Sequence, residues 1–203
     1  MIAVIGLAAL AAPRPAAPRP AAPLPAAPVP TWWTAFLKTT GFQARFVQES
    51  ESAVFGTLNR RGTLAGARGG RLRAAYDKGL VLVADGKTLV QYDPDTRTAQ
   101  RWDLREARNE APMLALLLDP ASTGAHFIVQ PLDGGRLRLK PRRKDLPDVE
   151  MEGSGSTPTI LRWIDPSGAR QVLRLEGVVA GAPLPAATFR FDPPAGTRWV
   201  GGR

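Results

Sequence analysis

The sequence predicts a mainly β fold, in which a curved antiparallel sheet of about ten or eleven strands forms an incomplete β-barrel and helices cover its concave face. Two observations predict this class. Most of the chain from residue 42 onward consists of short apolar or alternating runs separated by Gly, Pro and Asp turn signals. Residues 31–41 and 110–118 have helical spacing instead. We therefore expect the helices to plug or cover the mouth of the sheet.

The centre of the chain is predicted to be an antiparallel meander. Its three runs, residues 80–84, 88–92 and 98–102, are punctuated by Asp85-Gly86 and then by Asp93-Pro94-Asp95. Asp-Gly between alternating runs is typical of a tight hairpin, whose type I′ turn needs positive φ at both central residues. In the second turn Pro presets φ, and Asp can bond to nearby backbone.

Both faces of this meander carry apolar side chains, because neighbouring residues of a strand point to opposite faces. One face carries Leu80, Leu82, Ala84 and Leu89, and the other carries Val81, Val83, Val90 and Tyr92. An ordinary antiparallel sheet can leave one face wet. We therefore expect helices, a partner or an apolar ligand to cover the second face.

A short amphipathic helix is predicted before the first strand. Trp32, Trp33 and Phe36 have helical spacing, with Thr31 as a candidate N-cap and Gly41 as the stop. This much apolar surface is expected to pack on the sheet. The strands that follow are predicted at residues 42–48, 53–58, 62–67 and 71–76.

After the meander the pattern becomes helical and then returns to strands. Residues 110–118 are predicted as a helix, since Pro112 is tolerated in its first turn and Asp119-Pro120 closes it. Apolar residues nearly encircle this helix, which indicates burial or contact with a hydrophobic ligand. Further strands are predicted at residues 126–130, 136–140, 148–152, 159–164, 169–178 and 188–191.

The amino-terminal residues are predicted to lie outside the folded domain. Residues 1–12 hold an apolar run too short to span a bilayer and an Ala9-Leu10-Ala11 cleavage pattern, which together predict a signal peptide and export. Residues 13–30 are almost only Pro and Ala and are predicted to be an extended linker. Residues 31–200 are predicted to form a single domain.

The sequence holds no cysteine, which excludes disulfides and cysteine-ligated metal sites. It also leaves no thiol for a lipid at the mature amino terminus, so we expect a soluble protein. The net charge is +9, but the cations are spread along the chain and match no DNA- or RNA-binding module. Nucleic-acid binding is therefore not expected.

No pattern of catalytic residues is present. The only histidine, His126, begins a predicted strand, and the sequence contains no nucleophile elbow, phosphate-binding loop or His-Glu-x-x-His motif. The aspartates of the predicted turns are expected to bond local backbone. The sequence thus predicts no catalytic residue, no metal site and no cofactor, and the protein is not expected to be an enzyme.

Seven segments occur in an order and register that carry more information than any one of them. They are Phe42-Gln-Ala-Arg-Phe-Val-Gln48, Gly62-Thr-Leu64, Arg68 ahead of Arg71-Leu-Arg-Ala-Ala-Tyr76, Leu82-Val-Ala-Asp-Gly-Lys-Thr-Leu89, Tyr92-Asp-Pro94, Pro112-Met-Leu114 and Phe189-Arg-Phe-Asp-Pro-Pro-Ala-Gly196. Together they resemble the periplasmic outer-membrane lipoprotein carriers of the LolA family, from about residue 35 to residue 197.

The resemblance implies a periplasmic chaperone whose cavity binds the acyl chains of lipoproteins. Such a carrier receives its cargo from an inner-membrane ATP-driven (ABC) exporter and passes it to an outer-membrane receptor. The receptor shares the fold but is itself a lipoprotein, so the lack of cysteine favours the soluble carrier. A monomer is expected.

Residue by residue, the resemblance places Arg68 on the family's arginine that bonds to the lid and holds it closed. A guanidinium suits this task because its donors can cap free carbonyls at helix ends. An ordinary solvated arginine is the alternative. The predicted lipid-binding cavity is lined by Leu64, Leu72, Ala74, Leu82, Leu89, Met113, Leu114, Leu117, Phe127, Leu137 and Leu139. For each of these, simple core packing stays open as the alternative.

Two departures from the family pattern stand out. The family usually has Pro after the latch arginine and Trp two residues after the position of Leu72, where this chain has Gly69 and Ala74. The smaller Ala74 is expected to widen the cavity or loosen the lid. A module of the same fold that carries another lipid, or senses envelope stress, therefore stays open as an alternative.

Overall fold

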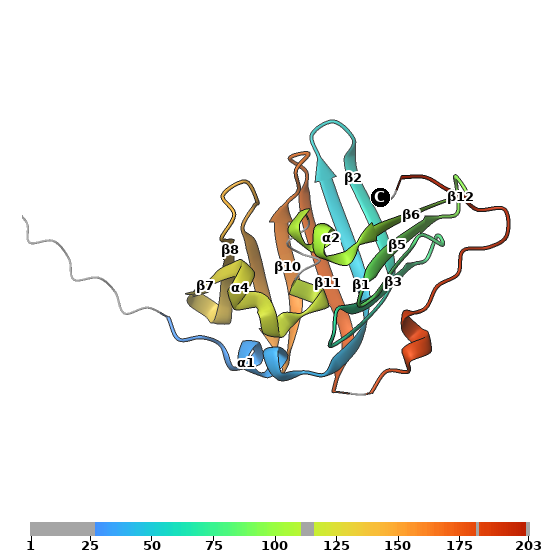
Figure 1. Ribbon diagram of the computed structural model, residues 1–203. Helices are drawn as coiled ribbons and strands as arrows, with labels where there is room; N and C mark the ends of the chain where they lie inside the picture. Colours follow the sequence, from blue (N-terminus) through green and yellow to red (C-terminus); the bar gives the residue numbers. More distant parts are fainter. Residues whose placement is uncertain (1–26, 111–115, 182, 202–203) are drawn as a thin grey trace, which may run out of the picture.

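The computed structural model describes residues 27–110, 116–181 and 183–201 (Figure 1). Its longest strands are β1 (Gly41–Ser52), β2 (Gly56–Ala67) and β11 (Arg170–Ala180). The other strands are β3 (Arg71–Tyr76), β4 (Val81–Asp85), β5 (Thr88–Asp93), β6 (Thr98–Asp103), β7 (Phe127–Leu132), β8 (Arg136–Pro141), β9 (Val149–Ser154), β10 (Thr157–Ile164) and β12 (Arg198–Trp199). The helices are α1 (Thr31–Lys38), α2 (Leu104–Glu110) and α4 (Thr123–His126), with 3₁₀ turns η1 (Pro120–Ser122), η2 (Asp133–Gly135) and η3 (Ala186–Phe189).

All twelve strands belong to one sheet, in the order β12-β6-β5-β4-β3-β2-β1-β11-β10-β9-β8-β7. Neighbours are antiparallel except for the two-residue parallel pair of β12 with β6. The outer strands β12 and β7 do not pair with each other, so the sheet is open. The predicted mainly β, incomplete-barrel class is thereby confirmed, with twelve strands in place of ten or eleven.

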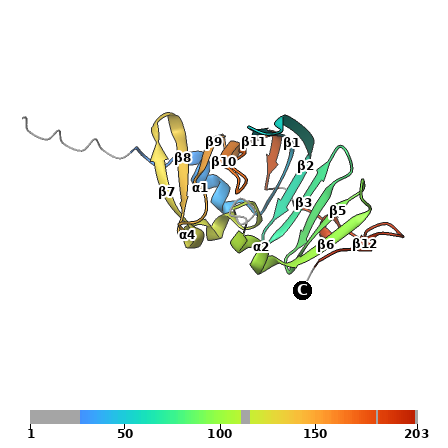
Figure 2. The same ribbon diagram turned by 90° about the horizontal axis from the view of Figure 1, so that it is seen from above.

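The sheet bends into two arms that meet at β1 and β11, as Figure 2 shows from above. One arm runs through β2 and β3 to β6, and the other through β10 to β7. The helices α1, α2 and α4 lie at the mouth between the arms. The helical segments therefore cover the concave face, as the sequence predicts.

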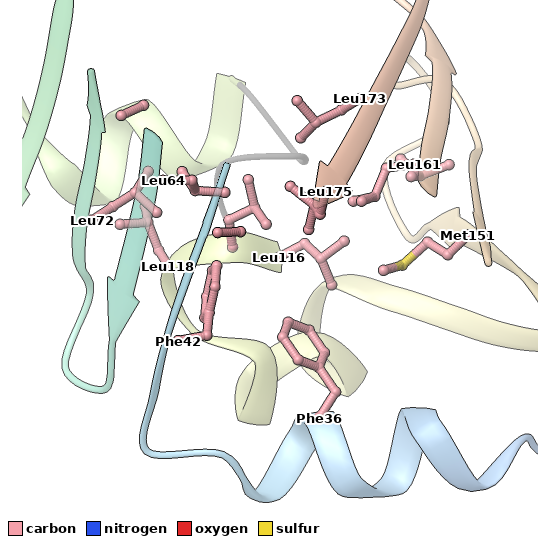
Figure 3. Close-up of a cluster of buried hydrophobic side chains, with 14 of the residues drawn as sticks. Phe36, Phe42, Leu64, Leu72, Leu116, Leu118, Met151, Leu161, Leu173 and Leu175 are labelled. Atoms are coloured by element: carbon pink, nitrogen blue, oxygen red, sulfur yellow. The ribbon is translucent and has the colours of Figure 1, made fainter. Parts of the chain in front are cut away.

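Inward-facing side chains of both arms form one apolar core with the helices (Figure 3). Along β1 every second residue, Phe42, Ala44 and Phe46, is buried, as expected when one face of a strand meets the core. Helix α1 contributes Trp32, Trp33 and Phe36, and the Trp32 indole Nε1 donates to the Gly135 carbonyl at 2.9 Å. The core thus joins the amino-terminal helix to both arms.

The convex face of the meander is covered by the carboxy-terminal segment of the chain. Val83 and Val90 are buried there although they lie outside the main core, and they share a hollow of about 220 Å³ with Phe189 and Phe191. Phe191 packs against Tyr92 with ring centroids 5.7 Å apart. From the sequence, helices, a partner or an apolar ligand are expected on this second face. An irregular segment of the same chain covers it instead.

Arginines of β3 hold this segment in place. The Arg71 and Arg73 guanidinium groups lie over the rings of Phe189 and Phe191, at 5.5 Å and 5.8 Å from the centroids. The Arg73 Nη1 also donates to the Arg190 carbonyl at 3.3 Å. These arginines point away from the concave face. Along β3 they alternate with Leu72 and Ala74, which belong to the core on the concave face.

The structure differs from the predicted elements in three places. The strands expected at residues 53–58 and 62–67 are one strand, β2, because Asn59, Arg60 and Arg61 stay in register with β1 beyond the covered core. The strand expected at 188–191 is replaced by η3 and extended chain, since this segment lies on the sheet face and pairs with no strand. A helix that the sequence did not predict, α2, begins at Leu104, where the Asp103 carboxylate accepts from the Arg105 N–H at 2.8 Å. Of the helix expected at 110–118, residues 110 and 116–118 are helical, and residues 111–115 lie outside the described residues.

Local signals at α1 and at the β4–β5 turn also differ from the prediction. Pro30, not Thr31, precedes the first helical residue, and Gly41 begins β1 while the extended Thr39 ends the helix. In the β4–β5 hairpin the two loop residues are Gly86 and Lys87, and only Gly86 has positive φ, so the turn is not type I′. The Asp85 Oδ1 instead accepts from the Lys87 and Thr88 N–H groups at 2.8 Å.

The contact between α1 and β9 leads to a prediction for Gly153→Ala. A Cβ at Gly153 would lie 2.2 Å from the Trp32 ring, so the indole must shift out of the core. We expect a loss of about 2 kcal/mol in the free energy of unfolding, typical of overpacking, measured by urea denaturation. Gly124→Ala is the control, since its Cβ meets open space. Equal stability of the two variants would contradict the packing argument.

Candidate functional site

The concave face brings most of the predicted cavity residues together. Eight of them are buried members of one core cluster: Leu64, Leu72, Ala74, Leu89, Leu117, Phe127, Leu137 and Leu139. Leu82 is half-buried and packs against that cluster. Met113 and Leu114 lie outside the described residues. The predicted residues thus come from both arms and from the helical cover.

The structure shows this surface in a covered state. The helical residues Leu116, Leu117 and Leu118 are 0%, 8% and 0% exposed. Leu116 and Leu118 lie between the arms (Figure 3). Leu104 and Ala107 of α2 are also buried against the core. Beside Leu117 and Phe42 the hollow measures about 10 Å³. The apolar face is therefore filled by side chains of the chain itself.

Several residues of this surface were missed by sequence reasoning. They are Phe36, Phe42, Phe46, Met151, Leu161, Leu173 and Leu175, all buried in the same cluster. The alternation within residues 42–48 and 169–178 contained this signal, because the inward face of each strand is apolar. What the sequence could not supply is which strands face one another across the bend.

Arg68 caps a helix end, but at α1. Its Nε donates to the Thr39 carbonyl at 3.2 Å and its Nη2 to the Lys38 carbonyl at 2.9 Å. These are carbonyls that a helix carboxy terminus leaves without intrahelical partners. Arg68 and Leu117 also line the same small hollow. Its predicted role as a latch on residues 110–118 stays a prediction.

Helix α2 is seated closely on the β2–β3 turn. Gly70 has φ +76°, and a Cβ there would lie 2.3 Å from the Arg108 Nη2 and 3.0 Å from the Leu104 Cδ2. The Arg108 Nε is buried and has no hydrogen-bond partner among the described residues. A positive φ and this close approach both favour glycine. Gly70 therefore lets the helical cover approach the sheet.

A row of hydrogen-bonded polar side chains, here called the polar belt, crosses the concave face where the apolar core ends. It consists of Tyr76, Gln48, Gln171, Ser50 and Asp165. The Tyr76 hydroxyl donates to the Gln48 Oε1 at 3.0 Å, and the Gln48 Nε2 donates to the Gln171 Oε1 at 3.1 Å. The Gln171 Nε2 donates to the Ser50 Oγ at 2.7 Å and to the Asp165 Oδ2 at 2.8 Å. Each buried amide is thereby partnered.

The two titratable members of the polar belt are shifted in opposite directions. Burial raises the pKa of the Tyr76 hydroxyl, with a smaller opposing effect of Arg60. Burial also acts to raise the pKa of Asp165, but hydrogen bonds from Ser167, Ala169 and Gln171 outweigh it and hold the pKa below its usual range. Both shifts keep the belt in one state near neutral pH, with a protonated tyrosine and an ionised aspartate.

The sequence of this chain matches a known protein family. The family model described as "Outer membrane lipoprotein carrier protein LolA" matches residues 37–192, well over half of the chain. The chain belongs to this family. The match includes both arms, the α2 cover and the segment that crosses the convex face.

Individual relatives agree with membership of the LolA family. An outer-membrane lipoprotein carrier protein from Bordetella bronchiseptica is 32% identical over 145 residues, which is 66% of this chain and 67% of the relative. The carrier from Bordetella avium is 32% identical over 122 residues, 57% of this chain and 58% of the relative. The latter match therefore spans less than two thirds of that relative's length.

A crystal structure of a LolA superfamily protein from Nitrosomonas europaea, NE2245, has the same fold. The TM-score is 0.52 at 12% identity, over 79% of this chain and 96% of that one. Within the described ranges, no helix of this chain is long and apolar enough to cross a membrane. The same residues contain no group of three or more His, Asp or Glu side chains placed to hold a metal ion.

The shifted pKa of Asp165 predicts a pH dependence of stability. Because the pKa of Asp165 is lowered in the folded chain, this carboxylate binds protons more readily in the unfolded chain than in the folded one. The difference begins as pH falls towards the unfolded-state pKa, about 3.9 for a free Asp. The stabilisation is therefore complete above that pH and is lost as pH falls through the lowered folded value. Asp165→Asn should flatten the decline in unfolding free energy between about pH 5 and pH 3, measured by urea denaturation.

The control for this titration is Asp133→Asn. Asp133 lies in the exposed β7–β8 turn, and its carboxylate makes no hydrogen bond to other described residues. This variant removes one carboxylate and leaves every hydrogen bond of the polar belt in place. If the free energy of unfolding of Asp165→Asn declines with falling pH as steeply as that of the wild type, the hydrogen bonds to Asp165 do not account for the pH dependence.

Proposed function

We propose that this protein is a lipoprotein carrier that binds acyl chains on the concave face of its sheet, between the arms and the helical cover. The observation that carries the proposal is the way the apolar face is closed. The cover consists of short helical segments of the chain, with Leu116 and Leu118 fully buried between the arms. Flexible hydrocarbon can replace such side chains without disturbing any strand pairing.

Simple magnitudes support a reversible exchange. Burying a palmitoyl chain of about 16 carbons is worth about 12 kcal/mol, at ~0.8 kcal/mol per methylene. Exposing the three leucines of residues 116–118 costs about 6 kcal/mol, at ~2 kcal/mol for each side chain. Association itself consumes several kcal/mol more. The balance favours binding but leaves the cargo removable by a partner.

In this proposal the closed state is restored by polar contacts at the edge of the core. Arg68 bonds the carboxy-terminal carbonyls of α1, next to the hollow that it shares with Leu117. Cargo that lifts residues 116–118 weakens the packing behind these bonds, and their return favours release. Met113 and Leu114 complete the lid in the proposal, and no catalytic residue, metal or cofactor is assigned.

The wider setting is part of the same proposal. Residues 1–12 act as a cleaved signal peptide that directs the chain to the periplasm, residues 13–30 act as a spacer, and residues 31–200 form one carrier domain. Cargo comes from an inner-membrane ABC exporter and goes to an outer-membrane receptor where one exists. Support comes from the apolar leader sequence, the absence of cysteine and membership of the LolA family.

Native mass spectrometry tests the cargo. The mature protein is purified from its own periplasm, and the bound mass is identified after denaturation and lipid extraction. We expect an acylated lipoprotein bound one to one. A free lipid in its place would move the function to lipid transport, and a protein that neither carries nor binds acyl chains would favour a sensor.

Thiol labelling tests the site of binding, because the native sequence contains no cysteine and an introduced thiol is the single site of modification. Leu118→Cys places a thiol on the cover, where the native side chain is 0% exposed. Addition of a triacylated lipopeptide should raise its rate of modification at least tenfold, since the cover must leave the core. Leu161→Cys on β10, also 0% exposed, is the matched control and should stay protected beneath the cargo. Unchanged labelling of Leu118→Cys in the saturated complex would place the cargo elsewhere.

A further inference from the structure

Two hollows open on the concave face beyond the polar belt, at the end away from α1. One, of about 540 Å³, lies between β2, β3 and β5, and the other, of about 370 Å³, lies between β1, β2, β10 and β11. Leu58 and Arg60 line both. At the α1 end, by contrast, the hollow beside Phe42 holds about 10 Å³. A ligand whose chains fill the core therefore has room for its polar end near Arg60.

The strand register connects these hollows to the core. Phe46 lies opposite Gly62, and one step further along the same face Gln48 lies opposite Arg60. Tyr76 lines the larger hollow and packs against the core cluster, and Trp163 does the same in the smaller one. Arg60 is therefore the first cation that a chain meets on leaving the apolar part of the face.

Arg60 is free to bind a ligand. Its side chain is exposed and makes no hydrogen bond or ion pair with another described residue. A guanidinium offers five N–H donors and no acceptor, so it binds groups that are rich in acceptors. The side chains of the neighbouring polar belt already bond one another. At its two ends the Tyr76 hydroxyl donates to Gln48 and the Gln171 amide donates to Asp165. Arg60 is thus an uncommitted donor, and among the basic residues that line the larger hollow it is the one that also lines the smaller hollow.

The surrounding charges decide which acceptor fits. The larger hollow is lined by three basic and three acidic side chains: Arg60, Arg61, Lys78, Asp77, Asp93 and Asp95. The smaller one has Arg60 and Asp165. Opposite charges balance in both, so neither provides the positive potential that holds a phosphate. Neutral carbonyl oxygens accept from Arg60 without meeting repulsion from the carboxylates.

We propose that the two hollows around Arg60 form the head-group site of the cargo and select neutral glyceryl ester and amide carbonyls over an anionic phosphate. This inference rests on the proposed acyl-carrier function. The chains of the ligand occupy the core, its ester and amide carbonyls meet Arg60 beyond the polar belt, and the attached peptide leaves through the open side of the larger hollow. Head-group charge then excludes the anionic phospholipids that surround the cargo in a membrane.

Three short-chain probes separate head from chain in a titration of the delipidated protein. They are a tri-octanoyl S-glyceryl-cysteinyl peptide of uncharged sequence, dioctanoyl phosphatidylglycerol and decanol. The wild type should bind the lipopeptide at least tenfold more tightly than the phosphatidylglycerol. Arg60→Ala should weaken lipopeptide binding roughly tenfold, as expected for lost hydrogen bonds to a charged donor. Decanol binding should not change, because decanol has no carbonyl.

Two further variants sharpen the test. Arg174→Ala removes the same charge from the convex face of β11, where the side chain is exposed between Leu173 and Leu175, and should leave all three affinities unchanged. Asp77→Asn with Asp95→Asn makes the larger hollow net positive and should strengthen phosphatidylglycerol binding several-fold.

The outcomes distinguish this inference from the carrier function. Failure of every probe to bind would overturn the proposed function. Binding of lipopeptide and decanol with no effect of Arg60→Ala, or with an equal loss for both, would overturn the head-group site alone. Tighter wild-type binding of phosphatidylglycerol than of lipopeptide would also overturn it.

Discussion

An apolar concave face on an open sheet has to be covered, and the rest of the architecture depends on how this chain covers it. The two arms diverge from β1 and β11 (Figure 2), and leucines and aromatic residues of α1, α2 and residues 116–118 belong to the core between them. Burial of this face dominates the stability of the domain. The cover is held by contacts of the same kind that an acyl chain makes, which is why a stable fold and an exchangeable ligand are compatible.

The sequence predicted the sheet, its central meander and the inward face of most strands, because alternation is a local signal. It failed where tertiary contacts decide. Asn59, Arg60 and Arg61 resemble a loop, yet β1 keeps them in a strand. Phe189 and Phe191 alternate like a strand, yet Arg71 and Arg73 hold them on the convex face as irregular chain. Arg68 was assigned to a helix end, but local sequence could not show that α1 supplies it.

The concave face changes character along its strands rather than across them. On β1 the inward residues run from Phe42 and Phe46 to Gln48 and Ser50, and β11 changes in the same way from Leu175 and Leu173 to Gln171. Antiparallel pairing brings these changes to one level, where the polar belt forms. A single sheet thereby provides a dry region and a wet region without a second domain, and the boundary between them is fixed by register.

The two edges of the sheet have a consequence for life in a crowded compartment. An open sheet exposes unpaired backbone groups that can recruit strands of other molecules into growing aggregates. Here one edge ends in β12, which is two residues long, and the other in β7, which carries Pro131 and therefore lacks a donor at that position. Both edges are poor templates for edge-to-edge polymerisation. The sheet can thus remain unclosed without the aggregation risk that an open barrel would otherwise carry.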